Sequence, residues 1–110
     1  MYQGTTPSLV FEIKNYDLSG ATVYVSFKQG NEVLTKTGSD VAVSYGGSIS
    51  TVVCFLTQEE TLAMRRGSVT VQIRFIYENG QAYATTEKQI EVSRVIYPAV
   101  ITYNGGDEDE

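Results

Sequence analysis

Apolar and polar residues alternate along much of this chain with the two-residue period of a β-strand. The clearest stretch, residues 69–77, has apolar residues at its odd positions and mostly polar residues between them. Residues 8–14, 23–28 and 89–93 show the same alternation. Each stretch has one apolar and one polar face, as in antiparallel sheets covered on one side. The expected inward residues are Leu9, Phe11, Ile13, Val23, Val25, Phe27, Val69, Val71, Ile73, Phe75, Tyr77, Ile90 and Val92.

Three further segments have weaker strand patterns. Residues 32–37 and 41–45 are short, and residues 49–56 are almost wholly apolar, which leaves the buried face of that strand ambiguous. A strand inside the fold tolerates apolar residues on both faces. We expect inward positions at Val33 and Thr35, at Val41, Val43 and Tyr45, and at Ile49, Val53 and Phe55.

The strongest turn signal is Asn79-Gly80, which suits a type I′ turn because both residue types tolerate positive φ. This turn predicts an antiparallel hairpin that pairs residues 68–78 with residues 81–94. Gly30-Asn31 and Gly46-Gly47 separate other expected strands.

One short helix is expected between strands. Thr57-Gln58-Glu59-Glu60 is a capping box, in which Thr57 caps the third helical N–H and Glu60 reaches back. Arg65-Arg66-Gly67 carries the basic residues and glycine typical of a helix end. About two turns fit between these signals, so the helix is a crossover from strand 49–56 to strand 68–78.

About seven strands with closely spaced turns predict an all-β fold, an immunoglobulin-like antiparallel β-sandwich with one short helical crossover. A small closed barrel is the alternative. The Cys…Trp…Cys pattern of antibody domains is absent, because the chain has one Cys and no Trp. We expect one domain over residues 1–103 and a disordered acidic tail over residues 104–110.

The charge argues against nucleic acid as a partner. The formal net charge is −5, and the last four residues supply four of the negative charges, so the remainder is nearly neutral. Nothing in it builds the basic field that phosphate binding requires. The N-terminus has no basic, apolar signal segment, and no apolar run has the length of a membrane span, so synthesis in a cytoplasm is expected.

Few residues of this chain are suited to catalysis. The chain has no His, which removes His-based triads, dyads and metal sites. Cys54 lies in an apolar run and is expected to be a small buried residue. Glu59 and Glu60 suit helix capping better than acid–base work. We therefore expect a protein that is not an enzyme and has no catalytic residues, cofactor or metal.

Eight Tyr residues and an apolar C-terminal stretch point to binding instead. Residues 95–103 are apolar except for Pro98 and Thr102, so they form either a closing edge strand or an arm that docks on a neighbouring subunit. Residues 2–7 are a second candidate arm, and Tyr24 and Tyr83 are expected to face outward. The candidate interface residues are Tyr2, Tyr24, Tyr83, Tyr97, Val100 and Tyr103.

Four segments also carry a family resemblance: YQGTTPSLVFEI at 2–13, DLSGATVYVSFKQG at 17–30, LTQEETLAMRRGSVTVQIRFIYENG at 56–80 and EKQIEVSRVI at 87–96. In this order they resemble small proteins encoded in phages and prophages of gut Firmicutes. The chain resembles more loosely the N-terminal sandwich domain of phage baseplate upper proteins. The similarity covers nearly the whole chain except its acidic tail, and its motifs are strands, turns and a helix cap.

The resemblance implies a virion structural or assembly component in the baseplate or tail, the head–tail junction or the capsid. Its implied partners are other phage structural proteins and further copies of the chain, through protein–protein contacts. A second hypothesis is a carbohydrate-binding sandwich that recognises a host-surface glycan through exposed Tyr. A groove with two or three coplanar Tyr on one sheet would favour this second hypothesis.

Overall fold

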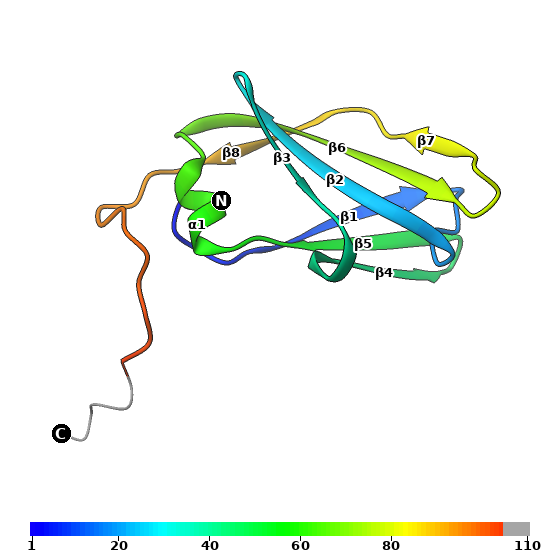
Figure 1. Cartoon of the computed structure of the whole chain (residues 1–110), viewed down its shortest axis with the longest axis horizontal. Coiled ribbons are helices and arrows are strands. Elements are labelled where there is room, and N and C mark those ends of the chain that lie inside the picture. Colours follow the sequence, from blue (N-terminus) through cyan, green and yellow to red (C-terminus); the bar gives the residue numbers. More distant parts are fainter. Residues whose placement is uncertain (105–110) are drawn as a thin grey trace.

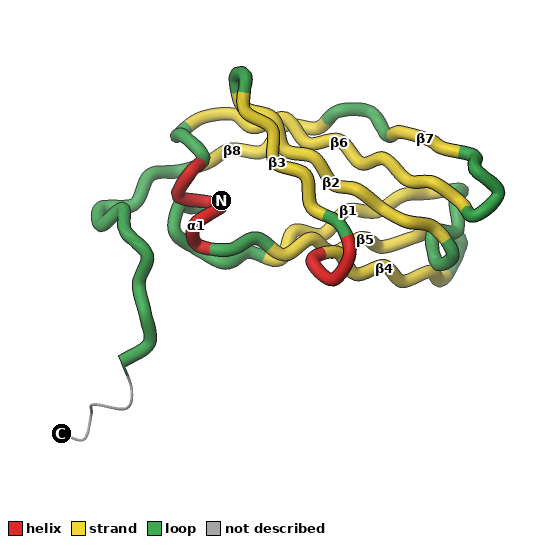
Figure 2. Tube along the Cα trace, in the orientation of Figure 1, coloured by secondary structure: helices red, strands yellow, loops and turns green. Residues whose placement is uncertain are grey.

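The structure is a computed structural model that describes residues 1–104. Two antiparallel sheets lie face to face, and a short helix closes one end (Figures 1 and 2). The three-stranded sheet has the order β1 (Ser8–Lys14), β5 (Ile49–Phe55) and β4 (Val41–Gly46). The five-stranded sheet contains β3 (Glu32–Lys36), β2 (Ala21–Gln29), β6 (Gly67–Tyr77), β7 (Ala82–Ala84) and β8 (Lys88–Val92). The helical elements are α1 (Gln58–Ala63) and the 3-10 turn η1 (Gly38–Asp40).

The strand order is that of an immunoglobulin-like sandwich. The order β1-β5-β4 corresponds to strands B-E-D of that fold, and β3-β2-β6 with β7 and β8 corresponds to C′-C-F-G. Helix α1 carries the chain from β5 in one sheet to β6 in the other, as the capping box predicts. The predicted all-β sandwich with one helical crossover is confirmed, and the barrel alternative is not formed because the described strands make two separate sheets.

The last expected strand is divided in two, which gives eight described strands rather than about seven. Strand β7 pairs with Arg74–Ile76 and β8 pairs with Gly67–Val71, both along the same edge of β6. Between these pairings, the three residues 85–87 lie opposite the two residues 72–73, and one extra residue on one strand is the mark of a β-bulge. The Thr85 hydroxyl accepts a hydrogen bond from the Ile73 N–H at 3.1 Å and holds the bulge in place.

The core lies between the sheets and matches the strongest alternation. The inward residues of β2 and residues 69, 71, 73 and 75 of β6 are almost completely buried, Tyr77 is partly buried, and Val92 of β8 is 2% exposed. Leu9, Phe11 and Ile90 are partly buried against this core. The core residues are Ile13, Leu18, Val23, Val25, Phe27, Val52, Cys54, Leu56, Met64, Val69, Val71, Ile73, Phe75 and Val92.

Two weaker strands present the opposite face to the one expected. In β3, Val33 is 62% exposed and Thr35 is exposed, while Lys36 is buried. The inward position of Lys36 is stabilised by an ion pair described below. In β5, Ser50, Val52 and Cys54 are buried and Phe55 points outward, so the predicted inward set Ile49, Val53 and Phe55 is wrong.

Ser50 explains why β5 turns its smaller residues inward. Its hydroxyl accepts a hydrogen bond from the Leu18 N–H at 2.9 Å and donates one to the Tyr16 carbonyl at 2.6 Å. These bonds satisfy backbone groups of the β1–β2 connection, which would otherwise be buried without partners. In β4, Val41 and Val43 pack against the core as predicted, whereas Tyr45 at the strand end is 46% exposed.

The β6–β7 hairpin has a longer loop than the type I′ turn expected at Asn79-Gly80. The Tyr77 N–H donates to the Gln81 carbonyl and the Gly80 N–H donates to the Tyr77 carbonyl, which closes a three-residue loop. Gly80 has φ +91°, while Asn79 is absent from the positive-φ residues of the described chain. This geometry is the three-residue hairpin with glycine in the left-handed position.

Candidate interaction site

The C-terminal segment, residues 95–103, carries the largest cluster of exposed apolar side chains along the chain. It contains no helix or strand, and it runs away from the α1 end of the sandwich (Figure 1). The closing edge strand considered from the sequence is therefore not formed there. The exposed residues of the segment, with their exposed fractions, are Ile96 (102%), Tyr97 (68%), Val100 (44%), Ile101 (59%) and Tyr103 (95%).

Helix α1 holds the C-terminal segment at one point. The Gln58 side-chain amide donates to the Ile101 carbonyl at 2.8 Å and accepts from the Ile101 N–H at 2.8 Å. This paired contact uses both backbone groups of one residue and leaves its side chain free to contact a partner. Gln58 is the first residue of α1, so the cap at Thr57 also positions this anchor.

The N-terminal residues, the second candidate arm, pack on their own sandwich. Tyr2 forms a parallel bridge with Ser93, and the Ser93 N–H donates to the Met1 carbonyl at 2.7 Å. Thr61 is fully buried, and its hydroxyl accepts from the Thr5 N–H and donates to the Thr5 carbonyl. The Tyr2 side chain is 59% exposed beside the start of the C-terminal segment.

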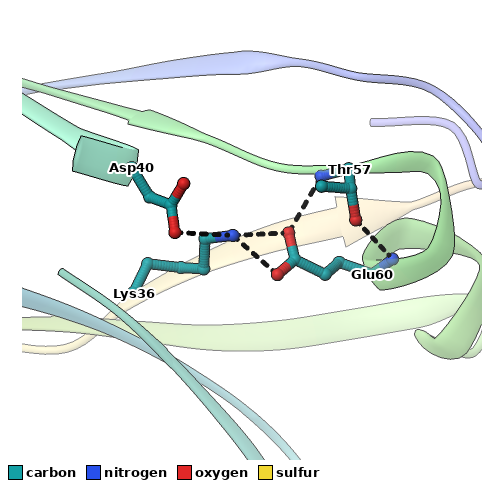
Figure 3. A network of polar contacts seen from close by, with 4 residues as sticks. All are labelled: Lys36, Asp40, Thr57 and Glu60. Atoms are coloured by element: carbon teal, nitrogen blue, oxygen red, sulfur yellow. Dashed lines mark hydrogen bonds and ion pairs between the residues drawn. The ribbon is translucent and has the colours of Figure 1, made fainter. Parts of the chain in front are cut away.

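A buried ion pair joins α1 to the edge strand β3 (Figure 3). The Lys36 ammonium, with its side chain 6% exposed, donates to both carboxylate oxygens of Glu60 at 2.7 and 2.6 Å. Asp40 lies 3.5 Å from the same ammonium. Glu60 also completes the predicted capping box, because it accepts from the Thr57 N–H at 2.8 Å. One carboxylate thus caps the N-terminus of α1 and neutralises a buried lysine.

These contacts move both pKa values in the direction that strengthens the pair. Burial raises the pKa of Glu60, but hydrogen bonds from Lys36 and the Thr57 N–H outweigh burial and hold that pKa below its usual value. Burial lowers the pKa of Lys36, but the hydrogen bond and charge of Glu60, together with Asp40, raise it above its usual value. Both groups therefore stay ionised across the neutral range.

The stabilising effect of this pair is expected to depend on pH. Because the folded pKa of Glu60 is depressed, its contribution is complete above the ordinary value of 4.5 and is lost as pH falls through the folded pKa. Because the folded pKa of Lys36 is raised, its contribution is complete below 10.5 and is lost as pH rises through the folded pKa.

Urea unfolding of the unchanged chain and of Glu60→Gln should therefore show a difference in unfolding free energy that is constant at neutral pH and shrinks below pH 4.5. Glu32→Gln, which alters an exposed ion pair with Arg65, is the control and should show little difference at any pH.

The α1–β3 cleft, a hollow of about 320 Å³, lies between helix α1 and the end of the larger sheet. Phe27, Leu34, Met64 and Val69 are among its apolar lining residues. Glu32 and Glu59 are the exposed charged residues among those that line it. Its lining is thus mostly apolar, with acidic groups that face solvent.

The tyrosines do not form a binding platform on a sheet face. Tyr24 is 39% exposed on the outer face of β2, opposite Arg74. Tyr83 is not outward: it lies opposite Phe75 on the inner face and stacks on that ring at 5.5 Å. Among the described residues, the aromatic ring pairs all belong to one cluster, Tyr16, Phe75, Tyr77 and Tyr83, and Tyr24 is in none of them.

A smaller apolar surface lies on the outer face of the three-stranded sheet. Val10 is 61% exposed and Phe55 is 42% exposed. Val53 is half-buried beside Val10 in the β1–β5 register. This surface belongs to regular strands, in contrast to the C-terminal segment, which contains none.

Within residues 1–104, no group of three or more metal-ligating side chains gathers. Cys54 is completely buried, as the sequence predicts, and burial raises the pKa of its thiol to about 11. In the part of the chain that the structure describes, no helix has the length and apolar character to cross a membrane. The expected tail lies outside the described residues except for Asn104.

Comparison with family models, with curated proteins and with solved structures finds no match for this chain. The fold therefore defines the class: an all-β sandwich of immunoglobulin topology. The exposed C-terminal segment contributes none of the core residues of this sandwich, so its apolar side chains are available for contact with a partner.

Sequence patterns locate the C-terminal segment but miss the surfaces beside α1. The segment was detectable because apolar residues crowd a stretch with no period. Lys36 and the α1–β3 cleft were missed, since a lysine on a short strand suggests a solvent-facing position. The sequence feature that indicates the Lys36 site is Glu60. Its position in a capping box directly after an apolar strand places a carboxylate near the core, where a buried lysine can pair with it.

Proposed function

We propose that this protein is a non-enzymatic structural or assembly module of a phage or prophage virion that acts through protein–protein contacts. The observation that carries the contact role is the exposed C-terminal segment. Five large apolar side chains at 95–103 each have more than two-fifths of their surface open to solvent. A concentration of exposed apolar surface in one segment marks a protein interface.

The virion setting is supported by the sequence segments that resemble small phage and prophage proteins. Strands, turns and the Thr57–Glu60 cap make up those segments. They describe a scaffold, so they support a place in an assembly rather than a reaction. The place is a baseplate or tail, a head–tail junction or a capsid, after synthesis in the bacterial cytoplasm.

The carbohydrate-binding alternative has less support. A sugar-binding platform usually presents exposed aromatic faces, and Tyr24 is the exposed Tyr of the larger sheet face. Its nearest partner across the strands is Arg74, and the described ring pairs lie at the inner cluster instead. The structural role therefore remains the better proposal.

The virion proposal predicts that the chain co-purifies with assembled phage particles. In a bacterium that encodes it, the prophage is induced and the particles are purified on a density gradient. Peptides of this chain should follow the major capsid protein at a fixed ratio through the gradient, as measured by quantitative mass spectrometry. An abundant host cytoplasmic protein is the control. If the peptides stay with that host protein and leave the particle fractions, the virion proposal is wrong.

A further inference from the structure

Strand β3 has an open edge. It lies at the end of the order β3-β2-β6, so within the described chain it pairs with β2 on one side only. Backbone N–H and C=O groups on an open edge are a template for a strand from another chain. Val33, at 62% exposure, adds an apolar side chain to this edge. Glu32 and Lys36 stand at the two ends of this edge, and the three residues between them are uncharged and pair with β2 without a bulge.

The α1–β3 cleft lies next to that edge. Leu34 of β3 and Met64 after α1 both line it, so a strand added to β3 would run along the mouth of an apolar hollow. Side chains alternate along a strand, and every second one would point toward the hollow. The site thus offers backbone pairing and a place for apolar side chains together, as in peptide recognition by strand addition.

The C-terminal segment has the composition and length that this site requires. In an extended conformation, Tyr97, Ala99, Ile101 and Tyr103 share one face. The nine residues reach about 30 Å, compared with about 16 Å for the five residues of β3. Pro98 has no N–H, so it suits a strand whose outer edge remains unpaired.

Charge also favours this match. Arg94, immediately before the segment, is exposed, and it has no ion pair within the described residues. The cleft presents the carboxylates of Glu32 and Glu59, and the ion pair that Glu32 forms among residues 1–104 is a 3.8 Å contact with Arg65. Arg94, at the N-terminal side of the segment, is therefore opposite in sign to the carboxylates at the cleft, whereas the acidic residues 107–110 follow the other side of the segment in the sequence.

A second copy of this chain offers a segment that matches the cleft. In its own copy the segment runs away from the sandwich (Figure 1), and both the segment and the cleft are open. Gln58 holds the segment at the start of α1, whose later residues Glu59, Glu60 and Ala63 line the cleft. Two copies that exchange segments would cover both apolar surfaces and close a symmetric dimer.

We propose that the C-terminal segment of one copy adds as a strand to the β3 edge of a second copy and places apolar side chains in its α1–β3 cleft. This inference rests on the proposed contact role of the segment and names its partner. Light scattering of the full chain should then give twice the 12.1 kDa mass of one copy. A full chain that stays monomeric at high concentration would overturn the exchange, while the particle experiment would still decide the virion proposal.

A matched pair of valine variants tests the acceptor. Val33 and Val10 are exposed to 62% and 61%, but Val10 lies on the other sheet. Val33→Lys places a charge on the proposed edge and should weaken dimerisation at least about tenfold. Val10→Lys should leave it unchanged. If only Val10→Lys weakens the dimer, or if neither does, the β3 edge is not the acceptor.

Ala63→Phe provides a second test that leaves β3 untouched. Ala63 is exposed at the end of α1 and lines the cleft, so a phenyl ring there would occupy the space meant for the segment. Dimerisation should weaken while circular dichroism remains that of a β-sandwich. A dimer that survives both Ala63→Phe and Val33→Lys, yet dissociates when the chain ends after Arg94, would retain the contact role and reject this acceptor.

Discussion

A chain that ends after Arg94 is expected to be monomeric in light scattering under conditions where the full chain associates. The truncation removes the exposed side chains of residues 96, 97, 100, 101 and 103, which are five of the exposed large apolar residues of the described chain. Apolar contacts dominate the stability of most protein interfaces, so their removal should abolish association rather than weaken it slightly.

The truncated chain should keep its fold, which separates loss of contact from loss of structure. Strand β8 ends at Val92, and the described bonds of Ser93 to Met1 and Gln3 remain. The truncation removes the Gln58–Ile101 contact, which is exposed and contributes about 1 kcal/mol for each hydrogen bond. A full-length substitution, Ile96→Ser with Ile101→Ser, should reproduce the monomer. An unchanged mass for the truncated chain would exclude the segment as the contact.

Lys36→Met is expected to lower the free energy of unfolding by about 3 kcal/mol. The substitution keeps the length of the side chain but leaves the Glu60 carboxylate, 22% exposed, without its partner. An uncompensated charge in a largely buried position is costly, because desolvation is no longer offset by the ion pair. Since Glu60 also belongs to the capping box of α1, the loss of its ion pair with Lys36 should also loosen the N-terminal turn of that helix.

Chemical denaturation of Lys36→Met and Lys28→Met gives the comparison. Lys28 is an exposed lysine on β2, so its replacement should change stability by less than about 0.5 kcal/mol. Adding Glu60→Gln to Lys36→Met should recover part of the loss, because the unpaired charge is then removed. Equal stabilities for the two single methionine variants would show that the ion pair contributes nothing beyond an exposed lysine.

The strands with regular alternation were predictable because each follows a single rule. In β2 and β6 the residues that bury apolar area are also those on one pleat face, so periodicity alone selects the inward set. The helix was predictable for a similar reason, since the Thr57–Glu60 box is a local contact that needs no information from the rest of the chain.

The buried faces of strands β3 and β5 are set by residues far away in the sequence, so the local pattern of apolar and polar residues does not predict them. Lys36 faces inward because Glu60, 24 positions later, neutralises it. Ser50 faces inward because its hydroxyl serves backbone groups of residues 16 and 18. In both strands a polar residue whose hydrogen bonds are satisfied is buried, while an apolar residue, Val33 in β3 and Phe55 in β5, faces outward. The same reasoning explains why the α1–β3 cleft was not expected, since Lys36 and Glu60 join the elements on either side of it.

The complete burial of Cys54 has a practical consequence for studying the segment. Its thiol has a pKa of about 11, so at neutral pH almost none of it is the thiolate that reacts with maleimides or disulfide reagents. It is also the one cysteine of the whole sequence. A cysteine introduced at position 103, where the native Tyr is 95% exposed, can therefore carry a fluorophore without any change to the native core. The emission of that label reports directly whether the end of the segment lies in water or against another protein surface.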